Sequence, residues 1–227
     1  MTDSSTFTDL KRSVSDADVV LDLGTKDGEN VSGLAGTILA MDISADQFDS
    51  GTAVEYVLGD GHRLPLRSNS VDYVFCTQVL EHVPETGRLI ADVARVLKPR
   101  GTAYFNFPNR LALDQPHAPI PRWYSLLPRR LGRLLGGYLL TEAHREYYER
   151  AVFPLSPIEA RRHMQDHFEN VKFPMRLDPS SVTSNETLQR ILWWLNTVAM
   201  YPPLKWLGEL LWPYSSYVCT DPVVGDE

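Results

Sequence analysis

The sequence predicts an α/β fold in which a mostly parallel sheet is covered by helices on both faces. Short apolar runs alternate with helix-compatible segments through the first half of the 227-residue chain, which is the pattern of a buried parallel sheet. One later segment also carries apolar residues at helical spacing, which indicates a helix packed on that sheet. A chain of this length can form one domain with a large core.

Seven runs are predicted as strands because they are apolar and rich in β-branched or aromatic residues. They are residues 19–23, 38–41, 54–58, 71–76, 102–107, 171–173 and 217–220. The clearest helix begins near Pro84, which suits a first helical turn, and the sequence KPRG at residues 98–101 ends it. Further helices are expected at residues 29–34 and 157–168, with helical structure within residues 131–149.

Composition sets the expected domain organisation. Residues 1–18 are polar and acidic, without the apolar core of a signal peptide, and are expected to be a frayed lead-in. Residues 19–227 then form a single domain. Its first part, residues 19–109, is expected to bind a cofactor, and residues 110–170 and 174–214 are expected to be insertions on the side of the second substrate.

Charge and cysteine usage exclude some classes of partner. A net charge of −7 argues against a broad nucleic-acid surface, although Arg129, Arg130 and Arg133 form a local basic cluster, interpreted as a solvated helix face. Cys76 and Cys219 lie far apart, without disulfide or metal spacing, so no metal site is predicted. A reducing, cytoplasmic location is expected.

Two segments together indicate an adenosine-type ligand. Residues 21–28, LDLGTKDG, lead a strand into a turn at Gly24, and glycine allows a ligand to approach the backbone closely. Asp42 ends the next strand about 20 residues later, where nucleotide-binding sheets place a ribose-binding acid. Alone, each signal is weak, since strand–glycine turns are common and a strand-end aspartate often caps a helix.

A third segment follows the next predicted strand. In residues 59–66, GDGHRLPL, Asp60 is placed to accept a hydrogen bond from an adenine amine, and Ile43 and Leu64 are placed to contact the ring. The alternative is a simple Asp–Gly turn. A fourth segment, residues 70–83, runs from a strand into a loop expected to cover the ligand.

Taken in order, these segments resemble class I S-adenosylmethionine-dependent methyltransferases of the small "type 11" kind. The resemblance rests on LDLGTKDG, AMDIS, GDGHRLPL, SVDYVFCTQVLEHV and RVLKPRGTAYFNFPN, and it covers about residues 18–109, with residues 217–220 similar to the last strand of that fold. It implies a Rossmann-like three-layer sandwich, a seven-stranded sheet with an antiparallel last strand, and S-adenosylmethionine as cofactor.

The resemblance also implies roles for residues in this chain. The glycine turn and Thr77–Gln78 are expected at the methionine part of the cofactor, Asp42 at the ribose, and the loop beginning at Asp60 at the adenine. The implied cofactor-binding residues are Asp22, Leu23, Gly24, Thr25, Gly28, Asp42, Ile43, Asp60, Gly61, His62, Thr77 and Gln78.

The expected activity is methyl transfer, with O-methylation favoured, to a small-molecule, lipid or glycan acceptor. His82, His117 and His144 are the candidate general bases, each with a structural role as the alternative. Lys26 stands where the family usually has glycine, and residues 29–34 and 45–52 are shorter than its usual helices. These departures support a second hypothesis, a non-catalytic cofactor-binding or interaction protein. A nicotinamide-dependent oxidoreductase is disfavoured because the turn lacks G-x-G-x-x-G spacing.

A tryptophan-rich segment near the C-terminus has two interpretations. Residues 188–212 are too interrupted by polar residues and prolines to span a bilayer, which requires about 20 apolar residues. The segment is interpreted either as a lid packed on the core or as an element at a membrane surface, where tryptophan is favoured. The second interpretation implies peripheral membrane contact and a lipid-linked acceptor. The segment contains Trp193, Trp194, Trp206 and Trp212.

Overall fold

The computed structural model describes the seven strands of the predicted sheet and, within the described residues, three α-helices. Described are residues 4–25, 28, 30–46, 48, 54–109, 155–174 and 214–223, with positions 131, 135, 186, 187, 190 and 194. The elements are α1 (Ser4–Ser13), β1 (Val19–Leu23), β2 (Thr37–Asp42), β3 (Glu55–Leu58), β4 (Val71–Thr77), the 3₁₀ helix η1 (Leu80–His82), α2 (Thr86–Val96), β5 (Leu97–Pro108), α5 (Pro157–Gln165), β6 (Phe168–Lys172) and β7 (Tyr214–Pro222).

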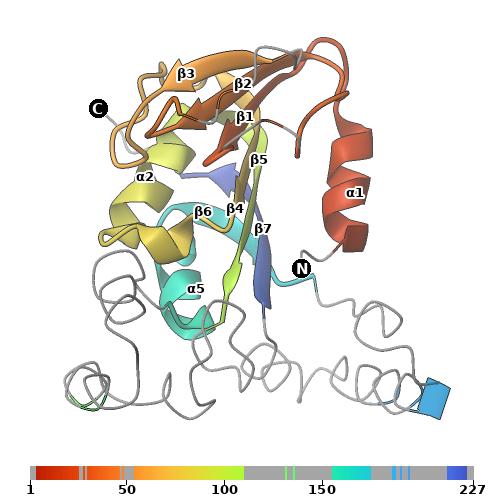
Figure 1. Ribbon diagram of the computed structural model, residues 1–227, viewed down its shortest axis with the longest axis vertical. Coiled ribbons are helices and arrows are strands. Elements are labelled where there is room, and N and C mark those ends of the chain that lie inside the picture. Colours follow the sequence, from red (N-terminus) through yellow and green to blue (C-terminus); the bar gives the residue numbers. More distant parts are fainter. Residues whose placement is uncertain are drawn as a thin grey trace.

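The seven strands form one mixed sheet in the order β3-β2-β1-β4-β5-β7-β6 (Figure 1). All neighbouring pairs are parallel except those of β7, which is antiparallel to both β5 and β6. The predicted strands and the antiparallel last strand are therefore confirmed. The chain builds the sheet outward from β1 to β3 and then returns to the other side of β1 for β4, so a topological switch point lies between β1 and β4.

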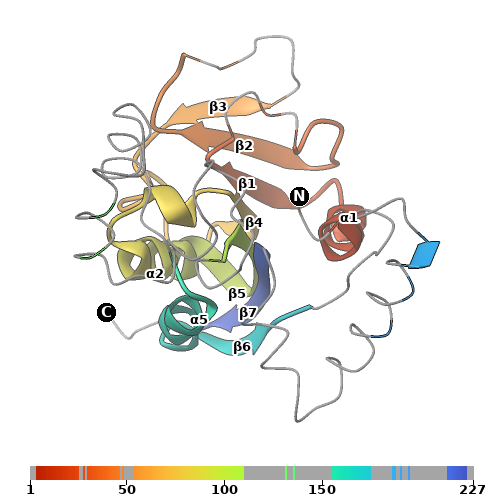
Figure 2. The ribbon, with the colours of Figure 1, turned by 60° about the horizontal axis from the view of Figure 1, so that its bottom comes forward.

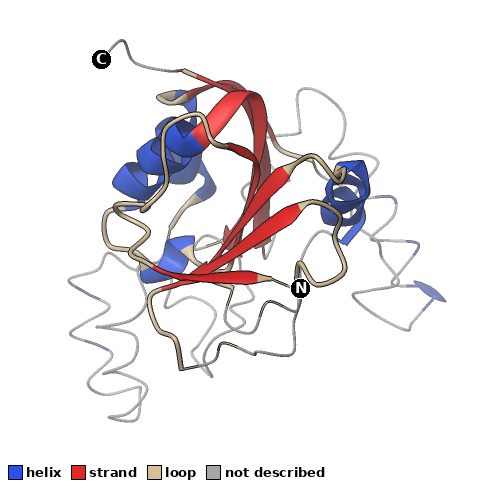
Figure 3. Ribbon diagram, turned by 90° about the horizontal axis from the view of Figure 1, so that it is seen from above, coloured by secondary structure: helices blue, strands red, loops and turns tan. Residues whose placement is uncertain are grey.

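Helices lie on both faces of the sheet, which confirms the three-layer sandwich. Helices α2 and α5 cover one face and α1 lies against the other (Figure 2), and the sheet is twisted between these layers (Figure 3). Successive side chains of β4 pack on opposite faces of the sheet. Val74 and Cys76 belong to the core beneath α2 and α5, whereas Phe75 belongs to the core beneath α1. All three side chains are fully buried.

The predicted frayed lead-in is wrong for residues 4–13, which form α1. Phe7 lies edge-on to Phe75, with ring centroids 5.2 Å apart, and stacks on Tyr104 at 5.1 Å. Leu10 and Val14 follow at helical spacing and pack in the same cluster. The polar composition of the segment conceals this narrow apolar face, which is stabilised by aromatic residues far away in the sequence.

One predicted helix and the start of one predicted strand also need correction. In place of the helix at residues 29–34, the described residues 30–34 form turns, and Gly33 and Gly36 adopt left-handed φ angles of 76° and 86° that a helix does not contain. Strand β5 begins at Leu97, directly after α2, instead of at residue 102. Its register on β4 shifts between Val71 and Tyr73, and left-handed Arg100 accommodates the extra residues.

The end of the predicted insertion 110–170 belongs to the core. Helix α5 packs Ala160 and Met164 into the main hydrophobic cluster, and β6 completes the sheet at its edge. Residues 110–130 and 136–154 lie outside the described residues, as does most of the tryptophan-rich segment, where Trp194 is described as 64% exposed. Within the described ranges, no helix is long and apolar enough to cross a membrane.

The docking of α1 gives a test of the corrected N-terminus. Phe7→Ala removes a ring that is only 8% exposed, and we expect it to lower the free energy of unfolding by about 3 kcal/mol because it leaves a cavity between Phe75 and Tyr104. Urea unfolding followed by circular dichroism measures this change. The control is Asp9→Ala on the exposed side of α1, where an exposed ion pair with Arg12 is lost. Equal stability of the two variants would show that α1 does not dock.

Candidate functional site

The segments singled out in the sequence meet at one edge of the sheet, where its central parallel strands end. Gly24, after β1, donates a backbone hydrogen bond to Met41 of β2 (2.8 Å), and Gly59, after β3, donates one to Asp42 (3.0 Å). Gln78, after β4, donates one to Asn106 of β5 (2.8 Å). In open parallel sheets, ligands bind beyond the carboxyl ends of the strands at a switch point. Here that point is the gap between the turn after β1 and the loop after β4.

The turn after β1 requires glycine for two reasons. Gly24 has a φ of 75°, which is costly for other residues, and a Cβ atom built on it would collide with the Val79 side chain. The backbone of this turn is therefore pressed against the loop after β4. Thr25 follows with only 2% of its surface exposed, and its Oγ1 has no hydrogen-bond partner within the described residues. A buried hydroxyl in this state is one that a ligand can satisfy.

Two buried acids give this edge a negative character. Asp22 is 1% exposed and Glu81 is 2% exposed. Burial raises the pKa of the Cys76 thiol well above its usual range, and the charges of Glu81 and Asp22 raise it further, which places both carboxylates near this residue of β4. Such an environment favours a ligand that carries positive charge.

Asp42 and Ile43 lie at the end of β2. Asp42 is half-buried, and its Oδ1 accepts a hydrogen bond from the backbone N–H of Ser44 (3.1 Å). Ile43 is 75% exposed, so its side chain is free to cover a ligand ring. Leu64 is different: it is 3% exposed and belongs to the core, which contradicts its predicted contact with a ring.

The loop after β3 contains the Asp–Gly turn that was the simpler interpretation. Asp60 Oδ1 accepts a hydrogen bond from the backbone N–H of His62 (2.9 Å) and lies 2.8 Å from His62 Nδ1. These two contacts, the backbone one first, hold the pKa of Asp60 below its usual range. Gly61 lies close to α2, because a Cβ built on it would press on the end of the Leu89 side chain. The aspartate is 59% exposed and ionised, so the turn leaves it available to a ligand.

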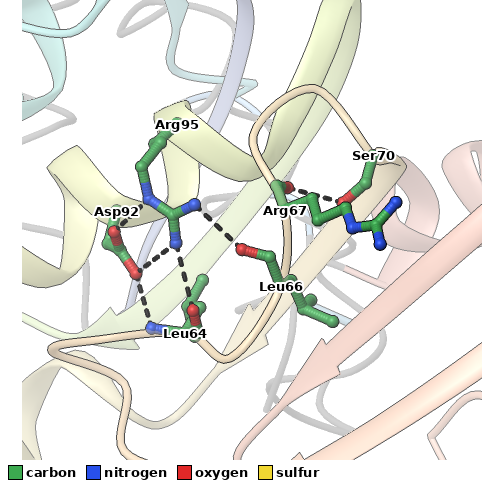
Figure 4. Close-up of polar contacts among 6 residues, drawn as sticks. All are labelled: Leu64, Leu66, Arg67, Ser70, Asp92 and Arg95. Atoms are coloured by element: carbon green, nitrogen blue, oxygen red, sulfur yellow. Dashed lines mark hydrogen bonds and ion pairs between the residues drawn. The ribbon is translucent and has the colours of Figure 1, made fainter.

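Helix α2 fixes this loop through a pair of charged residues that the sequence interpretation missed (Figure 4). Asp92 Oδ2 accepts a hydrogen bond from the backbone N–H of Leu64 (2.5 Å). Arg95 donates to the carbonyls of Leu64 (3.1 Å) and Leu66 (2.9 Å) and also bridges to Asp92. The available signal was an acid and a base three residues apart on a helix that otherwise faces the core.

The structure describes some of the remaining predicted site residues, whereas others lie outside the described ranges. Thr77 ends β4 and Gln78 follows it at the switch point, and His82 lies exposed at the end of η1. Lys26, His117 and His144 lie outside the described residues. Asn106, which was not predicted, is fully buried beside Gln78; an amide within the otherwise apolar run of β5 was the signal that pointed to it.

Comparison with known proteins identifies the segment that forms this edge. Residues 21–105 match the family described as "Methyltransferase domain". This segment is therefore similar to the class I S-adenosylmethionine-dependent methyltransferases. The match runs from within β1 to within β5 and includes the ends of β1, β2, β3 and β4.

Curated relatives match this chain over part of their length. The ubiquinone biosynthesis O-methyltransferase of Thiobacillus denitrificans is 32% identical over 124 residues, which are 48% of this chain and 53% of that protein. The malonyl-[acyl-carrier protein] O-methyltransferase of a Marinomonas species is 33% identical over 102 residues, 40% of this chain and 38% of the relative. The chain thus spans about half or less of the length of these relatives.

A solved structure supports the same fold over nearly the whole chain. The S-adenosylmethionine-dependent methyltransferase of Mesorhizobium loti superposes with a TM-score of 0.59 and 17% identity, covering 95% of this chain and 96% of its own. At this identity the similarity concerns the fold alone. It confirms the Rossmann-like architecture.

S-adenosylmethionine is the cofactor of this family, and the residues at the strand ends fit it. The cofactor joins a sulfonium and an ammonium group to a ribose and an adenine. Buried acids near Cys76 suit the cationic part, and Asp42 and Asp60 offer carboxylate oxygens to hydroxyl and amine donors. The buried Thr25 hydroxyl provides a further polar atom at the turn.

The tight turn at Gly24 gives a second test. Gly24→Ala imposes a strained left-handed residue and also displaces Val79, so we expect it to destabilise the protein by about 2 kcal/mol or more and to abolish cofactor binding. The matched control is Gly33→Ala, which has the same kind of φ (76°) but no atom within 4 Å of the added Cβ. It is expected to lose stability from backbone strain alone and to bind cofactor normally. Calorimetric titration and urea unfolding measure both properties; equal behaviour of the two variants would contradict the role of Val79.

Proposed function

We propose that this protein transfers the methyl group of S-adenosylmethionine to an oxygen atom of a small-molecule, lipid or glycan acceptor. The observation that carries the proposal is the meeting of Gly24, Asp42, Asp60 and Gln78 at the switch-point edge of the sheet, within the segment that matches the family. O-methylation is favoured because both curated relatives described above are named O-methyltransferases.

In this proposal, each strand end contributes to one part of the cofactor. Asp42 accepts hydrogen bonds from the ribose hydroxyls, and Asp60 accepts one from the adenine amine, with Gly61 and His62 lining the same loop. Ile43 covers the ring. Asp22 and Glu81 provide the negative surroundings of the cationic end, next to the turn of Leu23, Gly24, Thr25 and Gly28 and the loop of Thr77 and Gln78. When bound, the cofactor supplies an activated methyl group.

The protein's own contribution to the reaction is to align the acceptor, exclude water and manage one proton. An acceptor hydroxyl must lose its proton, whereas a carboxylate acceptor needs no base. His82 is the candidate base that the structure describes, and it is exposed at the end of η1, directly after the loop that follows β4. His117 and His144 are the other proposed bases, in the part of the chain expected to bind the acceptor.

The tryptophan-rich segment 188–212 is proposed as the cover of the acceptor site. Its apolar side chains suit an acceptor with an apolar part, which includes a small aromatic ring and a lipid-linked group. The two interpretations predict different behaviour. An internal lid leaves the protein unbound when it is floated with liposomes, whereas a membrane-surface element brings the protein into the liposome fraction.

The ribose contact gives the most direct test of the proposed site. Asp42→Ala is expected to weaken S-adenosylmethionine binding by about tenfold or more, because hydrogen bonds to a charged carboxylate are lost. Asp46→Ala is the control, since this exposed aspartate lies on the same loop, four residues further on. Isothermal titration calorimetry measures both affinities. Unchanged binding by Asp42→Ala would remove this residue from the site.

Wild-type protein then separates the classes of function. A methyltransferase is expected to bind S-adenosylmethionine and S-adenosylhomocysteine but not NAD, and to transfer label from radioactive cofactor to an acceptor in a cell extract. Cofactor binding without transfer to any acceptor supports the non-catalytic alternative. Binding of NAD instead of S-adenosylmethionine would refute the proposal.

A further inference from the structure

A chain of hydrogen bonds links the loop after β4 to strands β5 and β7. Gln78 Nε2 donates to Asn106 Oδ1 (2.8 Å), and Asn106 Nδ2 donates to Ser216 Oγ (2.9 Å). Tyr104 Oη donates to the same Ser216 oxygen (3.2 Å). We call these four residues the Asn106 relay. Asn106 and Tyr104 are fully buried, and Ser216 is 4% exposed.

Packing alone does not account for an amide at position 106. The neighbouring positions Phe105 and Phe107 of β5 are apolar and fully buried, and a buried amide is costly unless its donors and acceptor are satisfied. The register explains how the cost is met: Asn106 lies opposite Thr77 on one side and Ser216 on the other. The relay therefore runs across three adjacent strands, directly behind the cofactor edge.

The relay ends on a residue with a strained backbone. Gln78 has a φ of 57°, a left-handed conformation that costs a non-glycine residue free energy and that persists only where surrounding contacts impose it. Asn106 supplies two such contacts, since its carbonyl accepts from the Gln78 N–H (2.8 Å) and its side chain accepts from the Gln78 amide. Ser216 and Tyr104 in turn fix the orientation of the Asn106 amide.

Fixing the Gln78 amide decides which of its atoms is offered to a ligand. Its Nε2 is directed to Asn106, and among the residues that the structure describes none donates a hydrogen bond to its Oε1. An amide oxygen accepts hydrogen bonds from an ammonium group, and such bonds to a charged donor are stronger than neutral ones. The relay therefore presents an acceptor, not a donor, at the cofactor edge.

We propose that Asn106 and Ser216 are positioning residues that set the affinity of this protein for the amino-acid end of its cofactor, by holding Gln78 Oε1 ready to accept from the α-ammonium group. This inference rests on the proposed function, because it requires S-adenosylmethionine at the switch-point edge. It adds that recognition of the methionine part depends on residues that do not touch the ligand.

Two ligands that share an adenosine separate this role from general damage to the fold. S-adenosylhomocysteine contains the amino-acid end, whereas 5′-methylthioadenosine lacks it. Ser216→Ala and Asn106→Leu are expected to weaken S-adenosylhomocysteine binding by about tenfold, the effect of losing one oriented hydrogen bond to a charged group. Binding of 5′-methylthioadenosine is expected to stay at the wild-type level. Both affinities are measured by isothermal titration calorimetry.

Strand β7 offers a matched control. Ser215 is the residue before Ser216, is fully buried, and its hydroxyl has no hydrogen-bond partner within the described residues. Ser215→Ala therefore removes an equally buried oxygen outside the relay and is expected to change neither affinity. Ser216→Thr, which keeps a hydroxyl, is expected to restore S-adenosylhomocysteine binding. Should Asn106→Leu fail to fold, the comparison of Ser216→Ala with Ser215→Ala carries the test.

The binding measurements distinguish failure of the positioning role from failure of the proposed function. Equal weakening of both ligands by Ser216→Ala, or no weakening of either, overturns the positioning role and leaves the proposed function intact. Wild-type protein that binds neither ligand overturns the proposed function, and the positioning role with it.

Discussion

The close approach of two chain segments at the switch point organises the site. The chain leaves β1 toward β2 and leaves β4 toward the opposite side of the sheet, so the two exits lie side by side without crossing. Val79 fills the space where a side chain on Gly24 would lie, and both Gly24 and Gln78 adopt left-handed backbone conformations. The sheet thereby holds the backbone of these two loops next to each other.

The loops at this edge are held from behind by residues of rigid elements. Arg95 of α2 binds the carbonyls of the loop after β3, and Asn106 of β5 binds the residue that follows β4. Both supports use charged or amide groups that bind backbone or side-chain atoms of the loops. A site built in this way keeps its shape before the cofactor binds, so less ordering entropy is lost on binding.

The sheet extends beyond the segment that matches the family. The matched segment, residues 21–105, contains the strand ends assigned to the cofactor, whereas α5, β6 and β7 complete the sheet beyond it. The relay crosses this division, because Ser216 of β7 supports a loop of the cofactor half through Asn106. Residues that complete the sheet outside the matched segment are thus linked by hydrogen bonds to the loop after β4.

The sequence by itself determined the strands, the helix α2, the glycine turn and the positions of Asp42 and Asp60 at the strand ends. These are local patterns, set by apolar periodicity, by glycine's tolerance of positive φ and by the position of polar residues at strand ends. Only the tertiary structure decided that α1 docks through Phe7, that Leu64 faces the core and that Asn106 holds Gln78. Each of these depends on partners far away in the chain, such as Gln78 and Asn106 with a sequence separation of 28, and periodicity does not encode which distant residues meet.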